Sequence, residues 1–196
     1  MGTIDGNRCF FTRSGVYIDP FCMPVDDIVL GDIAHSLSSI CRFGGHTENF
    51  YSVATHSVYV SRQLEQHYVS DMPDDMRTSV LRWGLMHDAA EAYLGDIVSP
   101  VKNNMALYVD RYLEDYKDVE NDVLGKIATR FSLPWPVPQV VKAADTDLLS
   151  AEGKRFVESD SSAWDLPGAR PVSFEIESMY PPEGKALFIA RYEELS

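Results

Sequence analysis

The chain has 196 residues, of which 45% are hydrophobic and 24% charged, and its formal net charge at pH 7 is −13. This length and composition predict one globular domain over residues 1–196, with residues 1–25 as a hairpin or extended segment packed on the rest. The negative charge argues against sequence-independent binding of duplex nucleic acid, which needs a basic surface. The negative charge does not exclude binding of a small anionic substrate, because a cation or a few arginine and lysine side chains can make the electrostatic potential positive locally.

The amino-terminal stretch and the cysteines predict a cytoplasmic protein. The sequence "MGTIDGNRCFFTRSG" lacks the apolar core of a secretory signal, and the longest apolar runs are too short to span a bilayer. Cys9, Cys22 and Cys41 have no metal-binding spacing, and an odd number of cysteines without a signal peptide favours reduced thiols. We therefore expect no membrane association.

Taken in chain order, the predicted elements are one small hairpin followed by helices. Residues 8–19 read as two short strands around Ser14 and Gly15. Helices are then predicted over about 31–43 with Asp32 as the N-cap, 52–66, 76–94 with Gly95 as the C-cap, a new start at Ser99-Pro100, 104–131, 138–158 and 182–195. The fold class is thus all-α with a small N-terminal β-hairpin.

The segment "LRWGLMHDAAEAYLGDI", residues 81–97, places polar groups where a core face is expected. On a 3.6-residue period, one face of this helix carries Val80, Trp83, Gly84, His87, Glu91 and Leu94. Asp88 lies about 100° further round the helix. A carboxylate on a buried stripe is costly unless it is paired or bound to a cation.

Two further helices carry polar residues on their apolar stripes. His56 shares a stripe with Val53, Val60 and Leu64, and Asp145 is in line with Val141 and Leu148. Three helices that point histidines and carboxylates inward favour a divalent metal site. Either histidine taken alone could instead be a hydrogen-bonded core residue. His67 is predicted to be a surface residue. For His46 the sequence leaves open whether it lies next to the metal ligands.

The order His56, His87-Asp88 and Asp145 resembles the HD-domain metal-dependent phosphohydrolases. The segments "DIAHSLSSICRFGGHTENFYSVATHSV" (32–58) and "HDAAEAYLGDIVSPVK" (87–102) are similar to the bacterial 5′-deoxynucleotidases and their phage relatives. Some of those phage enzymes are dATP triphosphohydrolases. The resemblance covers roughly residues 16–195 and implies an all-helical HD bundle that releases phosphate or triphosphate from a deoxynucleotide.

The resemblance also implies roles for single residues. It implies that His56, His87, Asp88 and Asp145 hold the metal, a divalent transition ion (Co, Mn or Zn rather than Mg), with room for more than one ion. Glu91 would orient or deprotonate the attacking water, and Asp96 would assist the leaving group or hold a further ion. Members of the family are commonly homo-oligomers, dimers or hexamers, and a phage-encoded member would work in the host cytoplasm.

Substrate contacts are expected in two places. Arg42 matches the arginine that grips phosphate in the family, and its planar fork suits that task. Lys102 follows the predicted helix start at Ser99, where it could bind an anion or be a solvated surface cation. Phe43 stands where the deoxynucleotidases commonly carry tryptophan. Gly45 would leave open space beside the base or sugar, which argues against strict adenine specificity.

Two other classes of protein remain open on the sequence. An HD-type di-iron oxygenase of a small molecule would need more histidine ligands than the five histidines here readily supply. A non-catalytic nucleotide-binding protein would have no use for a water-activating carboxylate such as Glu91.

Overall fold

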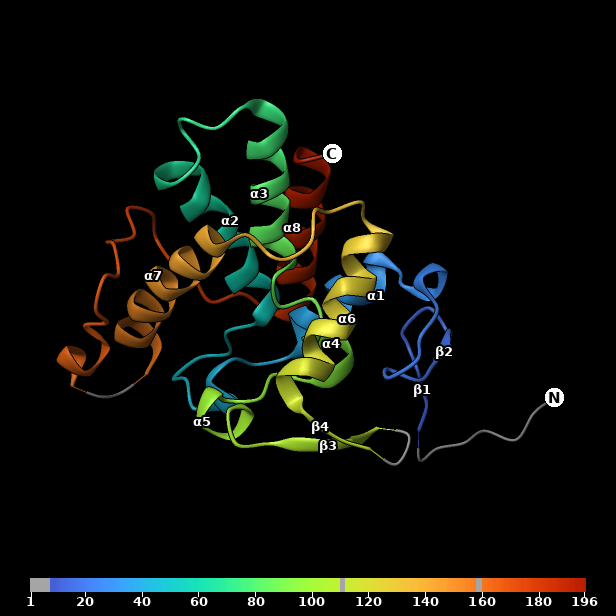
Figure 1. Ribbon diagram of the computed structural model, residues 1–196. Coiled ribbons are helices and arrows are strands. Elements are labelled where there is room, and N and C mark those ends of the chain that lie inside the picture. Colours follow the sequence, from blue (N-terminus) through green and yellow to red (C-terminus); the bar gives the residue numbers. More distant parts are fainter. Residues whose placement is uncertain (1–7, 110–111, 158–159) are drawn as a thin grey trace.

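The computed structural model describes residues 8–109, 112–157 and 160–196, and most of them are helical (Figure 1). In chain order the elements are β1 (Phe10–Phe11), β2 (Tyr17–Ile18), η1 (Val25–Asp27), α1 (Leu30–Ser39), η2 (Phe43–Gly45), α2 (Val53–His67), α3 (Asp74–Met86), α4 (Glu91–Leu94), α5 (Ser99–Lys102), β3 (Ala106–Val109), β4 (Tyr112–Asp115), α6 (Tyr116–Arg130), α7 (Gln139–Phe156), η3 (Ser161–Trp164) and α8 (Pro181–Glu194). Within these described ranges, none of the helices combines the length and apolar character that crossing a membrane requires.

Helix α2 lies at the centre of the bundle and packs against α1, α3, α7 and α8 (Figure 1). Every residue from Val53 to Leu64 except Arg62 is buried, as expected for a helix that is covered on all sides. The helix begins as predicted, because the Ser52 side chain accepts a hydrogen bond from the Thr55 backbone N–H and caps the first turn. Polar residues of α2 are therefore held in the interior, and they include His56.

The N-terminal hairpin is confirmed, but the predicted role of Asp32 is wrong. Strand β1 pairs antiparallel with β2. Helix α1 begins at Leu30, so Asp32 lies inside its first turn. The buried Asp32 carboxylate accepts hydrogen bonds from the Ser14 backbone N–H (2.8 Å) and hydroxyl (2.6 Å). Asp32 thus joins the hairpin turn to α1, a contact distant in sequence that a capping pattern does not reveal.

The predicted long helix over 104–131 is wrong in its first part. There, β3 and β4 form a second antiparallel hairpin, and α6 begins only at Tyr116. The segment Ala106–Val109 alternates exposed and half-buried side chains, which is the period of a strand, and its tyrosine and valine favour strand conformation.

The predicted helix over 76–94 is interrupted at residues 87–90. Helix α3 ends at Met86, and the next backbone bonds join residues three apart, from Ala89 N–H to Met86 and from Glu91 N–H to Asp88. This tighter winding is of the 3-10 type. Helix α4 then ends as predicted at Gly95, which has a φ of 84° and donates to the Glu91 carbonyl. Residues 87–90 therefore form a separate turn between two helices rather than part of one continuous α-helix.

Candidate metal centre

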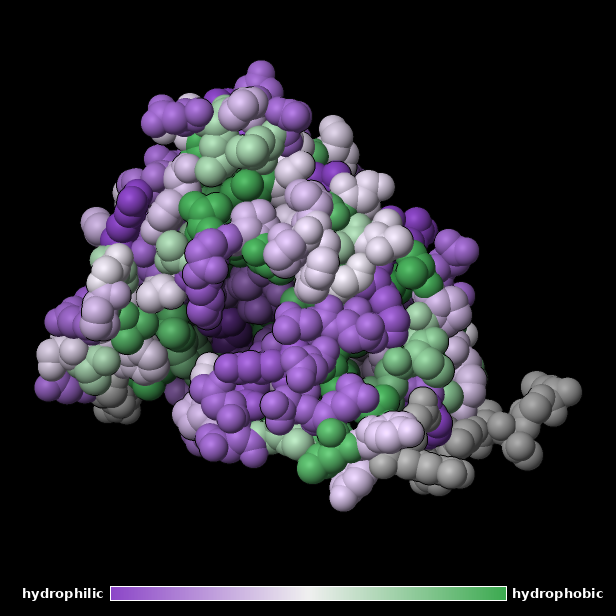
Figure 2. All heavy atoms as spheres, in the orientation of Figure 1, coloured by the Kyte–Doolittle hydropathy of each residue, from purple (hydrophilic) through white to green (hydrophobic). Residues whose placement is uncertain are grey.

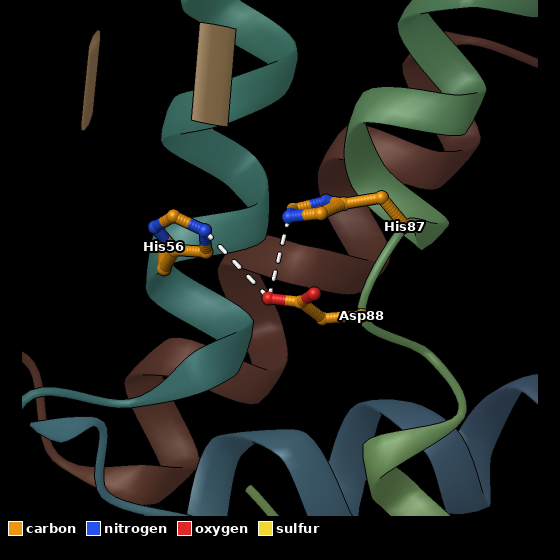
Figure 3. Close-up of side chains that lie close together, drawn as sticks. All are labelled: His56, His87 and Asp88. Atoms are coloured by element: carbon orange, nitrogen blue, oxygen red, sulfur yellow. Dashed lines mark ion pairs between the residues drawn. The ribbon is translucent and has the colours of Figure 1, made fainter. Parts of the chain in front are cut away.

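His56, on α2, faces His87 and Asp88, which lie at the join between α3 and α4, and the three side chains form a cluster (Figure 3). One ligand atom from each residue lies within 4.8 Å of the others, so the three could hold a metal ion. The Asp88 Oδ2 atom is 3.2 Å from His87 Nε2 and 3.7 Å from His56 Nε2. Two imidazoles and a carboxylate are common ligands of divalent transition metals.

The two Nε2 atoms have the bonding state expected of metal ligands. Both are buried, and neither has a hydrogen-bond partner within residues 8–109, 112–157 and 160–196. The opposite ring nitrogens are held, because His56 Nδ1 lies 2.7 Å from Glu152 Oε1 and His87 Nδ1 lies 2.8 Å from the Gly84 carbonyl oxygen. An Nδ1–H donated to an oxygen leaves the Nε2 lone pair of a neutral imidazole free for a metal. The residues therefore fit a bound cation.

Asp145, on α7, lies beside this cluster. Its Oδ1 atom is 3.3 Å from His56 Nε2, and its Oδ2 atom accepts a hydrogen bond from Lys142 Nζ at 2.6 Å. The structure thus brings together all four residues predicted as metal ligands, and Asp145 contacts the other three by way of its 3.3 Å approach to His56.

The sequence interpretation missed Glu152, which is fully buried behind His56. Glu152 Oε1 accepts hydrogen bonds from His56 and from the Tyr51 hydroxyl (2.7 Å), and Oε2 lies 3.3 Å from Arg42 Nε. A signal was present in the sequence, because Glu152 lies two helical turns after Asp145 and continues the stripe that includes Leu148. A second acidic residue on that stripe should have been read as part of the site.

Arg42 and Lys102 are part of the site rather than solvated surface cations. Arg42 Nη1 lies 3.5 Å from Asp88 Oδ2, and the arginine side chain is 11% exposed. Lys102 Nζ lies 3.4 Å from Glu91 Oε1 and 2.7 Å from Glu120 Oε1, with a side chain 17% exposed. Glu91 itself is buried, and its Oε2 atom has no hydrogen-bond partner among the described residues.

The protonation states reflect this crowding of charges. Burial and the Arg42 charge oppose a protonated His56, but Glu152 and Asp145 outweigh them and raise the pKa of His56 to about 9. Burial works against ionisation of Asp88, but His87 and His56 hold its pKa well below the usual range. Burial, together with the charges of Asp88 and Asp96, raises the pKa of Glu91 well above its usual range.

A cavity of about 460 Å³ opens beside the cluster and contains most of the predicted substrate and catalytic residues. Its lining includes Arg42, Phe43, Asp88, Glu91, Asp96, Lys102, Asp145 and His46. A second cavity of about 580 Å³ adjoins the cluster between α6 and α7. Figure 2 shows a hollow between these helices with mostly hydrophilic residues around it.

Gly45, His67 and His46 are all exposed at the surface. Gly45 is exposed and does not belong to the cavity lining, although its φ of 80° requires the backbone freedom of a glycine. His67 is exposed, as predicted. His46, which was left open, is exposed at the cavity rim.

Comparison with known proteins shows similarity to two bacterial proteins. No protein-family model matches it. The chain is 36% identical over 173 residues to the uncharacterized protein YfdR of Escherichia coli K12, an alignment that covers 87% of this chain and 86% of YfdR. The chain belongs to the YfdR family. It is also 30% identical over 192 residues to the uncharacterized protein RCAP_rcc00048 of Rhodobacter capsulatus, covering 91% and 89% of the two chains.

Proposed function

We propose that the protein is a metal-dependent phosphohydrolase of the HD-domain type that acts on deoxynucleotides. The observation that carries the proposal is the pair of buried Nε2 atoms of His56 and His87, which meet the Asp88 carboxylate and have no hydrogen-bond partner in the described part of the chain. In this proposal His56, His87, Asp88 and Asp145 hold the ion. When bound, a divalent ion supplies Lewis acidity, lowering the pKa of a water molecule and polarising a phosphoryl oxygen.

Glu91 is proposed as the group that takes the proton of the attacking water. Its Oε2 atom is buried and has no hydrogen-bond partner among the described residues, so this oxygen is available to accept a proton. The water oxygen bonds to phosphorus, and the bond from phosphorus to the deoxyribose 5′ oxygen breaks. Asp96 is proposed to protonate that oxygen, because burial raises its pKa against the opposing charge of Arg42.

Arg42 is proposed to bind the phosphoryl group. Its guanidinium is held between Glu152 and Asp88, so its orientation is fixed before substrate arrives. This fixed orientation lowers the entropy lost on binding.

The adjoining cavity supports triphosphate over phosphate as the released product. It is lined by Lys102, Lys117 and Lys142 together with Asp88, Glu120 and Asp145, and its volume of about 580 Å³ leaves room for a phosphate chain. Lysine ammonium groups bind phosphate oxygens as point charges. Lys102 and Lys142 line both cavities, and Lys117 adds a cation in the second one that a monophosphate would not need.

A nucleotide panel tests the proposal. The protein is stripped of metal and reloaded with Mn, Co, Zn, Mg or Fe. Each form is then given NMP, dNMP, NTP and dNTP substrates, and phosphate, triphosphate and oxygen uptake are measured separately. We expect metal-dependent release of triphosphate or phosphate from deoxynucleotides, abolished by a chelator. Iron-dependent oxygen uptake, or the absence of hydrolysis with every metal, would overturn it.

A further inference from the structure

Phe43 adopts a backbone conformation that is strained for its residue type. Its φ is 57°, in the left-handed region, and Gly44 and Gly45 follow it with φ of 60° and 80°. Non-glycine residues rarely adopt this region, and those that do often lie at ligand-binding sites. The strained loop directs the Phe43 ring towards Trp164, where the two ring centroids lie 5.6 Å apart at an interplanar angle of 88°.

Trp164 is fixed in this position by helix α7. A Cβ atom added at Gly153 would lie 2.0 Å from Cδ2 of Trp164, so the indole packs directly on the helix backbone where only glycine leaves room. The Ser150 hydroxyl, one helical turn earlier, donates to the Trp164 carbonyl oxygen. The same helix carries Asp145 and Glu152, so the indole and the metal centre share one rigid support.

The aromatic pair and the metal centre line one cavity. Phe43 and Trp164 line the cavity that also contains Asp88, Glu91 and Asp145. The apolar part of the lining further includes Ile97, Val98, Leu149 and Val157. Arg42 joins the two parts, because its guanidinium carbon lies 5.6 Å from the Phe43 ring centre while Nη1 lies 3.5 Å from Asp88 Oδ2. The cavity therefore has a charged part and an aromatic part on either side of one arginine.

We propose that Trp164, together with Phe43, binds the planar heterocyclic ring of the substrate and is a specificity-determining residue of this site. The assignment rests on the proposed function, since the charged part of the cavity would receive the phosphoryl groups of the same molecule. Every nucleobase offers a π-face, so binding through aromatic rings selects for a base without selecting one base. The inference predicts that this pair discriminates a nucleotide from a phosphate compound that lacks a base.

Paired binding measurements with and without a base test the inference. The probes are dATP and inorganic tripolyphosphate, titrated calorimetrically into the metal-loaded full-length chain. Trp164→Leu should weaken dATP binding by about tenfold or more while tripolyphosphate binding changes less than about twofold. Trp135→Leu is the matched control, because Trp135 is a half-exposed tryptophan outside this cavity lining, and it should change neither affinity.

A second variant moves the indole without removing it. Gly153→Ala should displace Trp164 and reproduce the selective loss of dATP binding, with metal content unchanged. Gly125→Ala is its control, since a Cβ at Gly125 would meet Trp135 at an ordinary 3.9 Å.

The inference is overturned if wild-type protein does not bind dATP, if Trp164→Leu binds it normally, or if that variant loses dATP and tripolyphosphate equally. Trp164-dependent binding of dATP without any hydrolysis would support the base site and contradict the proposed hydrolase, so the two failures are distinguishable.

Discussion

Glu152 Oε1 lies 2.7 Å from His56 Nδ1, on the side of the imidazole away from Nε2, the nitrogen proposed to bind the metal. The carboxylate is fully buried and also accepts the Tyr51 hydroxyl. A carboxylate in this position fixes the tautomer and orientation of a ligating histidine. The buried Glu152 charge is in turn balanced by Arg42, which links the support of the metal centre to the residue proposed to bind phosphate.

Glu152→Gln should therefore weaken metal binding, although Glu152 is not itself one of the proposed metal ligands. Glutamine keeps the volume but removes the charge that favours an Nδ1–H donor, and losses of this kind are about 10- to 100-fold in metal affinity. Competition titration against a chelator of known affinity measures the change. Exposed Glu193→Gln is the control, and equal metal affinities in the two variants would contradict the role assigned to Glu152.

Asp88→Ala should remove bound metal and activity together. Asp88 Oδ2 is the atom that faces both imidazoles, so its loss removes the centre of the cluster. The incomplete ligand set loses affinity and geometry at once. Metal content by elemental analysis and turnover are compared with those of exposed Asp71→Ala. Full occupancy with full turnover in Asp88→Ala would show that the ion is held elsewhere.

Arg42→Ala should lower both kcat/KM and thermal stability. Loss of the charge-assisted bonds to phosphate should reduce kcat/KM by the equivalent of about 2–4 kcal/mol. The substitution also leaves the Glu152 carboxylate buried without its partner, which destabilises the fold. Arg42→Lys keeps the charge but not the planar fork, so it should recover more stability than activity. An unchanged KM in both variants would place phosphate binding at other residues.

Glu91→Gln should give a folded, metal-loaded protein that turns over at least about a hundredfold more slowly, since glutamine cannot accept a proton. The melting temperature should not fall, because the substitution removes a carboxylate that is crowded by Asp88 and Asp96. If Glu91 serves only as the ion partner of Lys102, the opposite pattern is expected, with a lower melting temperature and nearly normal kcat.

Gly84→Ala should destabilise the protein. A Cβ at Gly84 would lie 2.5 Å from Leu64 Cδ1 and 2.9 Å from the Ser61 Cα, so α3 approaches α2 too closely for a side chain. Overpacking of this kind costs about 1–3 kcal/mol. Gly31→Ala is the control, because a Cβ there meets nothing within 4 Å. Chemical denaturation of the two variants should show a loss only for Gly84→Ala.

Local patterns in the sequence predicted the features that depend on neighbouring residues. The helix that begins near Ser52, the stop at Gly95 and the helix that follows Pro138 are confirmed. His56 and His87 stood out because each interrupts an apolar stripe.

Features that depend on distant residues were missed. The position of Glu152 matters because it contacts Arg42 and His56, and that of Trp164 because it contacts Gly153 and Phe43. Arg42, His56 and Phe43 are distant in the sequence from Glu152 and Trp164. The second hairpin was missed because its acidic and tyrosine-rich residues fit a solvated helix as well as a strand.

The tightly wound join at residues 87–90 has a mechanical consequence. On its near side, α3 is packed on α2 and is followed directly by His87, whereas on its far side α4 contacts α1, where the Ser36 hydroxyl donates to the Ala92 carbonyl. His87 and Glu91 therefore belong to two different packing partnerships, although they are close in sequence. A displacement of α1 against α2 would shift Glu91 relative to His87. The distance between these two side chains therefore depends on how α1 packs against α2.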